Sequence, residues 1–317
     1  MVQRRDFLKS AGAVGAIGLS AGCIGNFGSQ PYGDGTVTFV MSPSEPQEYM
    51  MKQYKPVKQF LAEKTASNVD VKLQYAADYT AVLQALGSGN AEIAETGPFA
   101  AALGVKAEKA NIALQRYAYG SWDYSSVIVT RKDSGIETLS DLKGKKIAFA
   151  DMTSASGSLY PLYQLKQAGL DVGKAPRSDE GADFSATWSS HAQAFQAMKN
   201  GQADACGVGR FITVKDADEN GDGERDYKDF VQEVSRYKGI PRAPVVTSPT
   251  LSTEKKEKLV SILDGAPNSM YYGADGKEGT NDDLWFSKMR PADLKTYQPV
   301  IDVANDLGIS TDLLSSA

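Results

Sequence analysis

The chain contains few of the residues from which metal centres and disulfide bridges are built. Only one histidine and two cysteines occur among its 317 residues. A single histidine excludes a histidine-rich zinc centre, and two cysteines limit the chain to one disulfide. The second cysteine, Cys206, lies in the apolar run 203–208. We therefore expect Cys206 to be a buried packing residue.

An excess of positive charge is also missing. The net charge is −5. Residues 1–23 contain Arg4, Arg5 and Lys9 against Asp6, so the remaining chain carries about −7. An acidic surface argues against nucleic-acid binding, which favours a basic stripe.

Familiar catalytic and nucleotide-binding motifs are absent from the sequence. After residue 23 it has no G-x-S-x-G elbow, and no G-x-G-x-x-G loop occurs anywhere in the chain. The stretch that ends in Gly173-Lys174 approaches a phosphate-binding loop, but Ala168 and Ala175 occupy positions that need Gly and Ser or Thr. We therefore reject a P-loop.

No apolar stretch reaches the length of a membrane span, but the N-terminus has the pattern of an export signal. Arg4-Arg5 precedes an apolar segment that ends at Leu19, about ten residues after Lys9 and too short to span a bilayer. The pattern predicts a twin-arginine signal. Ser20-Ala21-Gly22-Cys23 is similar to a lipoprotein processing site, although Leu19 lies four rather than three residues before the cysteine. We expect lipidation at Cys23, anchoring on the outer face of the cytoplasmic membrane and a flexible tether over 24–35; a cleaved signal without lipid is the alternative.

Beyond the tether, strand and helix patterns alternate. Strands are predicted over 37–41 and 69–75, with an amphipathic helix over 47–64 between them. A further strand, 146–150, leads into the polar segment 151–161. This alternation predicts an α/β fold with mainly parallel sheets that are flanked by helices. About 280 residues suffice for two domains.

Segment 151–161 has the sequence DMTSASGSLYP and joins a predicted strand to a predicted helix. The first N–H groups of a helix lack internal partners and lie at the positive end of its dipole. Small residues let an anion approach those groups, and hydroxyls add neutral donors. The segment is therefore a candidate site for a tetrahedral oxyanion, and an ordinary N-cap is the alternative.

Over residues 36–310 the chain resembles the phosphate, phosphite and phosphonate-binding lipoproteins of ABC importers. The resemblance rests on four stretches in a fixed order: DYTAVLQAL at 78–86 closing in EIAETGPF at 92–99, YSSVIV at 124–129, LSDLKGKKIAF at 139–149 running into 151–161, and HAQAFQAMKNGQAD at 191–204. It implies two α/β lobes with a ligand cleft between them, lobe 1 from 36–131 plus 240–317 and lobe 2 from 132–239. It also implies a monomer that delivers its ligand to an ABC permease.

The resemblance further implies a phosphoryl site, whose residues are Tyr79, Tyr124, Ser154, Ala155, Ser156 and His191. Ala155 replaces a threonine of the family pattern, which removes one hydroxyl but keeps the backbone N–H. Thr153 is a candidate to compensate for that hydroxyl. His191 would be a donor whose charge can switch.

The far end of the pocket departs from aminoalkylphosphonate-binding members of the family. Where those members carry carboxylates, this chain has Phe211 and Arg242. A ligand ammonium group would then meet no opposite charge. We therefore predict a ligand without an amine: phosphate, phosphite or a short alkylphosphonate.

Two acidic stretches are candidates for structural calcium, although we predict no required cofactor. Segment 218–229 matches an EF-hand loop in spacing, with Asp at its last position in place of Glu. Its candidate ligands are Asp218, Asn220, Asp222, Glu224, Asp226 and Asp229. Segment 275–283 is a second candidate. A solvated acidic loop is the alternative for both.

Three other functions compete with import. Ser154 or Ser156 with His191 could form a nucleophile and base, although one histidine and no elbow motif make an enzyme a poor candidate. A module that presents ligand to a sensor has the same sequence features as an importer component. The same fold could also bind another anion, such as a sulfonate.

Overall fold

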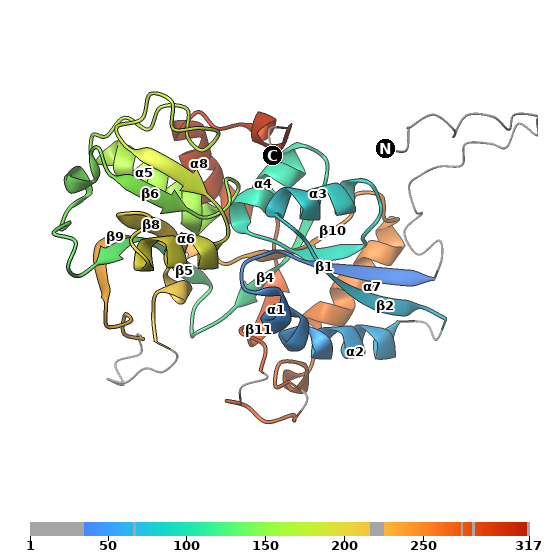
Figure 1. Cartoon of the computed structure of the whole chain (residues 1–317). Helices are drawn as coiled ribbons and strands as arrows, with labels where there is room; N and C mark the ends of the chain where they lie inside the picture. Colours follow the sequence, from blue (N-terminus) through green and yellow to red (C-terminus); the bar gives the residue numbers. More distant parts are fainter. Residues whose placement is uncertain (1–34, 66–67, 216–224, 274, 281–282, 316–317) are drawn as a thin grey trace, which may run out of the picture.

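The computed structural model describes residues 35–65, 68–215, 225–273, 275–280 and 283–315. These residues form two lobes, each built on one β-sheet (Figure 1). The predicted export signal, tether and Cys23 lie outside the described residues. None of the helices in the described part of the chain is both long and apolar enough to cross a membrane.

The first sheet has six strands in the order β11-β4-β10-β3-β1-β2. Strand β1 pairs in parallel with β2 and β3, whereas β10 and β11 run antiparallel to their neighbours. The strand bounds are β1 (Thr36–Met41), β2 (Asp70–Tyr75), β3 (Ile93–Glu95), β4 (Asn111–Tyr117), β10 (Pro244–Thr247) and β11 (Lys288–Pro291).

The second sheet has five strands in the order β7-β6-β8-β5-β9. Its bounds are β5 (Asp123–Arg131), β6 (Lys146–Phe149), β7 (Ser185–Trp188), β8 (Ala205–Gly209) and β9 (Val231–Pro241). Strands β6, β7 and β8 are parallel, whereas β5 pairs antiparallel with both β8 and β9. The predicted α/β architecture with two sheets is confirmed, with more antiparallel pairing than the sequence indicated.

Strand β5 corrects the predicted lobe boundary. The sequence division placed all residues up to 131 in lobe 1, but the pairing of β5 with β8 and β9 puts Asp123–Arg131 in the second sheet. The chain crosses between the sheets at 118–122 and returns at Arg242-Ala243. Both crossovers are short, and the Arg242 N–H donates to Trp122 O at 2.9 Å, so they lie side by side.

Helices cover both faces of each sheet because alternate strand residues point to opposite sides. In the first sheet, Val40 packs towards α3 and α4, while Phe39 and Met41 pack towards α1, α2 and α7. In the second, Ile147 faces α5 and Ala148 faces α6. The helices are α1 (Gln47–Gln53), α2 (Lys55–Lys64), α3 (Tyr79–Gly87), α4 (Pro98–Lys106), α5 (Tyr160–Gln167), α6 (His191–Lys199) and α7 (Thr253–Asp264).

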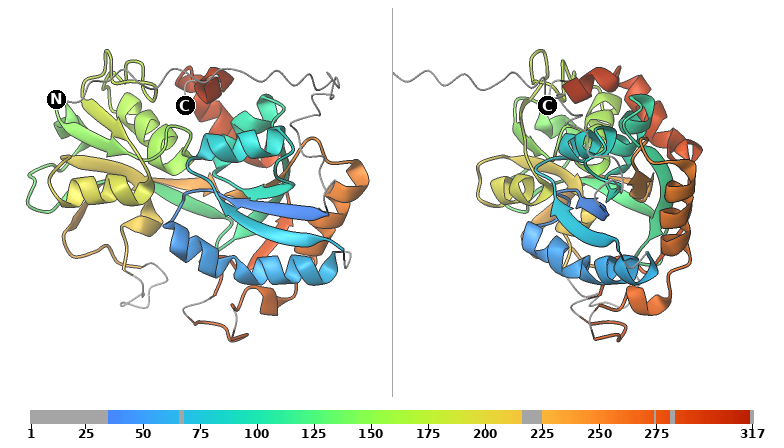
Figure 2. Two further views of the ribbon diagram at one scale, coloured as in Figure 1. Left: turned by 45° about the vertical axis from the view of Figure 1, so that its right-hand side comes forward. Right: turned by 90° about the vertical axis from the view of Figure 1, so that its right-hand side faces the viewer.

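The C-terminal helix α8 (Gln298–Asp306) connects the two lobes (Figure 2). Val300 of α8 belongs to one buried cluster with Leu83 of the first lobe and Leu159 of the second. Lys166 of α5 also pairs with Asp306 at 3.1 Å. A continuous apolar core therefore crosses between the lobes on this side.

Candidate functional site

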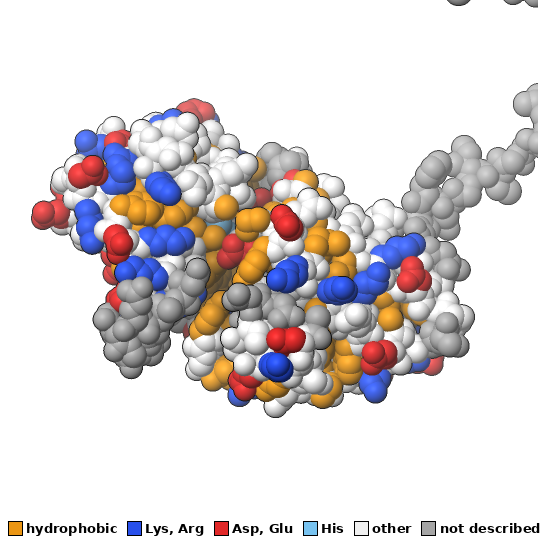
Figure 3. All heavy atoms as spheres, turned by 60° about the horizontal axis from the view of Figure 1, so that its bottom comes forward, with side chains coloured by type: hydrophobic (Ala, Val, Ile, Leu, Met, Phe, Trp, Pro, Cys, Tyr) orange, Lys and Arg blue, Asp and Glu red, His pale blue; other side chains and the backbone are white. Residues whose placement is uncertain are grey.

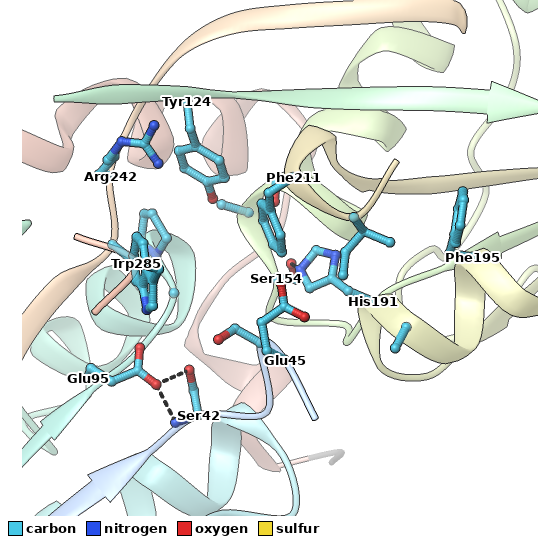
Figure 4. Close-up of a pocket in the computed structure, with 18 of the residues that line it drawn as sticks. Ser42, Glu45, Glu95, Tyr124, Ser154, His191, Phe195, Phe211, Arg242 and Trp285 are labelled. Carbon is cyan, nitrogen blue, oxygen red and sulfur yellow. Dashed lines mark hydrogen bonds between the residues drawn. The ribbon is translucent and has the colours of Figure 1, made fainter. Parts of the chain in front are cut away.

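A cavity of about 450 Å³ lies between the lobes and receives side chains from both (Figure 4). Figure 3 shows the molecule hollowed between the two lobes, with Lys and Arg side chains on the left-hand lobe beside the hollow. Eight of the nine predicted pocket residues line the cavity: Tyr79, Tyr124, Ser154, Ala155, Ser156, His191, Phe211 and Arg242. The residues that were predicted from the sequence therefore come from both walls of the cavity.

The hydroxyl segment after β6 begins a helix, as predicted. Ser154 is the N-cap of a single π-helical turn, Ala155–Leu159, that continues into α5, and its Oγ accepts from the Gly157 N–H at 3.1 Å. The N–H groups of Ala155 and Ser156 lie in the first turn, where no intrahelical acceptor exists. Ala155 and Ser156 line the cavity together with Ser154.

Thr153 does not line the cavity. Its N–H and its hydroxyl both donate to Asp151 Oδ1 at 2.7 Å, and its side chain is buried. The two short bonds close an Asx-type turn that directs the hydroxyl away from the cavity. Thr153 therefore supports the turn and does not replace the hydroxyl that Ala155 lacks.

Gly157 lets the turn and His191 approach each other closely. A Cβ at this position would lie 2.1 Å from Ala150 Cβ and 2.8 Å from His191 Cε1. Both distances are far below van der Waals contact, so a larger residue would separate β6, the turn and the histidine.

His191 is the first residue of α6, which Ser190 and Gln193 begin with a capping box. The ring is 2% exposed. The Gly209 N–H donates to His191 Nδ1 at 3.2 Å, so the proton of the neutral ring resides on Nε2. Nε2 lies 3.1 Å from Ser154 Oγ and donates to it.

This arrangement fixes the direction of the Ser154 hydroxyl. Its oxygen already accepts from His191 and from the Gly157 N–H, so its own hydrogen is available to the cavity. Burial lowers the pKa of His191 from 6.5 to about 4. The ring is therefore neutral at pH 7, and the charge switch expected from the sequence falls well below neutral pH.

Tyr79 and Tyr124 both line the cavity, and both keep their hydroxyl protons at neutral pH. Tyr79 begins α3, and its ring packs so closely on Gly97 that a Cβ there would lie 2.9 Å from Tyr79 Cε1. Burial raises the pKa of Tyr79 well above its usual value. Burial also raises the pKa of Tyr124 to about 12, against the opposing effect of a hydrogen bond with Ser156.

Phe211 does not lie at a far end of the pocket. Its ring packs edge-on against His191 with 5.3 Å between the centroids. Gly209 permits this because a Cβ there would lie 2.1 Å from Phe211 Cε1. The short turn after β8 thus places Phe211 on the histidine, and the predicted position is wrong.

The first lobe contributes a buried ion pair that sequence reasoning missed. Arg116 Nη2 lies 2.8 Å from Glu95 Oε2, and both side chains are 1% exposed. Glu95 Oε1 accepts from the N–H and the hydroxyl of Ser42 at 2.6 and 2.7 Å. Arg116 also donates to Tyr54 OH and Ala243 O, and its guanidinium lies 4.5 Å from the Trp285 ring centroid.

The sequence offers one signal for this network: Arg116 is a charged residue within the strand β4. Glu95 appeared only as part of the longer motif 92–99. Interactions with Tyr54 and Glu95 raise the pKa of Arg116 against the opposing effect of burial. The pair is internally balanced, so it shapes the cavity wall without adding net charge.

A second set of charged residues brings to the pocket a carboxylate that the sequence analysis did not place there. Glu45, from the loop before α1, lines the cavity together with Arg225 and Lys228 of the second lobe. Burial raises the pKa of Glu45 to about 7, and the two cations oppose that shift. These residues lie in loops far apart in the sequence, which no local pattern brings together.

Of the candidate calcium ligands, Asp218, Asn220, Asp222 and Glu224 lie outside the described residues. Asp229 pairs with Lys215 at 3.1 Å. In the second loop, Asp275 and Asp283 accept hydrogen bonds from the loop itself. No group of three His, Cys, Asp or Glu residues suited to a metal occurs in the described ranges. Calcium stays a prediction, and an unchanged melting temperature on chelation at low salt would contradict it.

Comparisons with known proteins agree with this geometry. A family model described as "ABC transporter, phosphonate, periplasmic substrate-binding protein" matches residues 39–297. The Phosphate-import protein PhnD of Mycolicibacterium smegmatis is 32% identical over 54% of this chain and 54% of its own length. The Phosphonates-binding periplasmic protein of Escherichia coli is 32% identical over 40% of this chain and 38% of its own. The chain thus spans about half the length, or less, of the curated relatives it matches.

Two solved structures share the fold. A binding protein component of an ABC phosphonate transporter from Pseudomonas aeruginosa is 24% identical, with a TM-score of 0.68 over 84% of this chain and 85% of that chain. PhnD1 from Prochlorococcus marinus, solved with methylphosphonate, is 17% identical, with a TM-score of 0.68 over 87% and 99%. The family model covers most of the chain, and the fold matches that of these structures. The chain therefore belongs to the phosphonate periplasmic substrate-binding proteins of ABC transporters.

Proposed function

We propose that this protein captures a small phosphorus oxyanion, namely phosphate, phosphite or a short alkylphosphonate, and delivers it to an ABC permease. The observation that carries the proposal is the Ser154 hydroxyl, which His191 and Gly157 orient towards the cavity. Beside it are the first N–H groups of a helix. Such neutral, preoriented donors bind an oxyanion without burying a second charge.

Binding of this anion would close the two lobes. The ligand would contact both walls of the cavity and shift the equilibrium towards the closed form that a permease recognises. The short crossovers at 118–122 and Arg242-Ala243 are the segments able to act as hinges.

The geometry argues against a serine hydrolase. His191 Nε2 carries the proton that faces Ser154, so the ring is not placed to accept the serine's proton. Its Nδ1 faces a backbone N–H and not an orienting carboxylate. The curated relatives are likewise named as import and binding proteins.

Isothermal titration with phosphate, phosphite, methylphosphonate and sulfate tests the proposal. We expect at least one phosphorus oxyanion to bind, and Ser154→Ala to weaken it at least tenfold, since a hydrogen bond to a charged group contributes about 1.5–3 kcal/mol. Thr153→Val is the matched control, because its hydroxyl lies in the same turn but off the cavity. Binding of sulfate alone would favour the sulfonate alternative.

For localisation, we propose twin-arginine export and anchoring through a lipid on Cys23. The sequence pattern at Arg4-Arg5 and 20–23 supports this, and the family is periplasmic. Fractionation of cells that express Cys23→Ala is the test. Release of the protein from the membrane fraction supports the anchor, whereas an unchanged distribution contradicts it.

A further inference from the structure

Arg242 is a buried cation that the phosphoryl site does not use. It lies in the return crossover, lines the cavity and is 9% exposed. Among the described residues its guanidinium makes one hydrogen bond, from Nε to Ser121 O at 3.0 Å. No carboxylate of the described chain lies within ion-pair distance of it.

Arg116 is a second buried arginine, and its charge and N–H groups are satisfied by neighbouring protein groups. That residue uses Nε, Nη1 and Nη2 on Ala243, Tyr54 and Glu95. Arg242 leaves both of its Nη groups without a protein acceptor in the described part of the chain. Burial lowers the pKa of Arg242 to about 10, as expected for a charge whose lost hydration is not replaced.

The surroundings of Arg242 hold it in place and strengthen its positive field. Its backbone N–H donates to Trp122 O and its carbonyl accepts from Tyr297 OH, so both crossovers and the C-terminal segment fix the residue. Its guanidinium lies 5.4 Å from the Tyr119 ring centroid, and that of Arg225 lies 4.6 Å from the same ring. Two cations therefore flank one aromatic ring on the cavity wall.

Tyr124 connects this cation to the phosphoryl site. The Arg242 guanidinium lies 5.9 Å from the Tyr124 ring centroid, and Tyr124 hydrogen-bonds with Ser156 of the hydroxyl turn. The two sites are thus separated by about the length of one side chain. The cavity of about 450 Å³ has room for more than a four-oxygen anion.

We propose that Arg242 forms a second anion subsite, and that the preferred ligand is a phosphonate that carries a carboxylate on a short carbon chain. The proposal rests on the proposed function, because the phosphoryl group must occupy the hydroxyl turn. The carboxylate then takes the free Nη groups in a paired geometry that planar guanidinium favours.

Isothermal titration of matched ligands tests the subsite. Phosphonoacetate and 3-phosphonopropionate are compared with ethylphosphonate and propylphosphonate, which replace the carboxylate by a methyl group. We expect at least one carboxylate ligand to bind the wild-type protein tenfold or more tightly than its methyl counterpart. Equal affinities, or tighter binding of the methyl ligands, would overturn the proposal.

Variants assign the preference to Arg242. In Arg242→Gln the carboxylate-to-methyl ratio should fall to near one, while methylphosphonate still binds. Lys228→Gln removes another cavity cation and should leave the ratio unchanged, which separates a specific subsite from a general effect of charge. If Arg242→Gln does not fold, Arg242→Lys takes its place and should lower the ratio. A preserved ratio in the Arg242 variant overturns the assignment. If no phosphorus compound binds the wild type, the proposed function itself fails.

Discussion

On the first-lobe wall of the cavity, Glu95 and Arg116 form a buried ion pair, whereas on the second-lobe wall Ser154 and His191 are equally buried but uncharged. The ion pair satisfies itself through Ser42, Tyr54 and Ala243. The part of the second-lobe wall formed by Ser154 and His191, here called the neutral wall, keeps the Ser154 hydroxyl hydrogen for the cavity. We infer that the Glu95–Arg116 pair contributes mainly shape and stability, and that Ser154 with its supporting His191 contributes anion binding.

The largest expected effect is the loss of the ion pair. Arg116→Met leaves the Glu95 carboxylate buried without a cation, and should lower the free energy of unfolding by about 3–5 kcal/mol. Denaturant unfolding measures this. The exposed pair Lys174–Glu180 is the control, since Lys174→Met should cost less than about 1 kcal/mol. A similar loss of unfolding free energy in both variants would show that the buried ion pair contributes no more to stability than the exposed one.

Next in size is the effect of filling the space at Gly157. Gly157→Ala places a methyl group against Ala150 and His191, and should cost about 1–3 kcal/mol of stability. It should also weaken oxyanion binding at least tenfold, because the Ser154 hydroxyl loses its orientation. Gly265→Ala, at the end of α7, is the matched control and should bind normally. Normal binding by Gly157→Ala would show that the turn does not contribute to oxyanion binding.

The third prediction concerns the buried, neutral His191. Its pKa is about 4 when folded and 6.5 as the reference value, so the unfolded chain binds more protons below pH 6.5 and stability falls as pH decreases. Between pH 8 and pH 5 this residue should account for a loss of about 2 kcal/mol. In His191→Gln that part of the pH dependence should disappear. Unfolding curves at both pH values for both proteins provide the measurement; parallel losses would show that His191 titrates normally.

The smallest expected effect tests the charges at the mouth of the cavity. Because the pKa of Glu45 is about 7, this carboxylate is mostly charged at pH 8 and mostly protonated at pH 6. Glu45→Gln should therefore tighten methylphosphonate binding several-fold at pH 8 and little at pH 6. Glu48→Gln, in the first turn of α1, is the control. An equal effect at both pH values would contradict the shifted pKa.

Local pattern was enough to predict the neutral wall. The small and hydroxyl residues between β6 and α5, the cap Ser190 before His191 and the cap Asp78 before Tyr79 are encoded within a few residues of each other. The two-lobed fold followed from strand and helix alternation together with the family resemblance. The single predicted helix over 47–64 is two helices that meet at Tyr54, with Pro56 in the first turn of the second.

The charged wall was beyond such reasoning because its partners are distant in sequence. Arg116 meets Glu95 only through the pairing of β3, β10 and β4, and Glu45 meets Lys228 only across the cleft. The protonation of His191 was also beyond sequence reasoning, because burial in the folded protein lowers its pKa to about 4. The position of β5 in the second sheet depended on antiparallel partners that arise later in the chain.

Trp285 has a consequence for observing the protein at work. Its indole lines the cavity and stacks over Arg116, and a second tryptophan, Trp122, lies at the outgoing crossover against Arg290. The third, Trp188, stacks on Phe149 away from the lining of the cavity. Two of the three tryptophans thus lie where ligand arrival and lobe rotation change their surroundings. The intrinsic emission of the unlabelled protein provides an optical signal for the kinetics of closure, with Trp285→Phe separating the contribution of the cavity from that of the crossover.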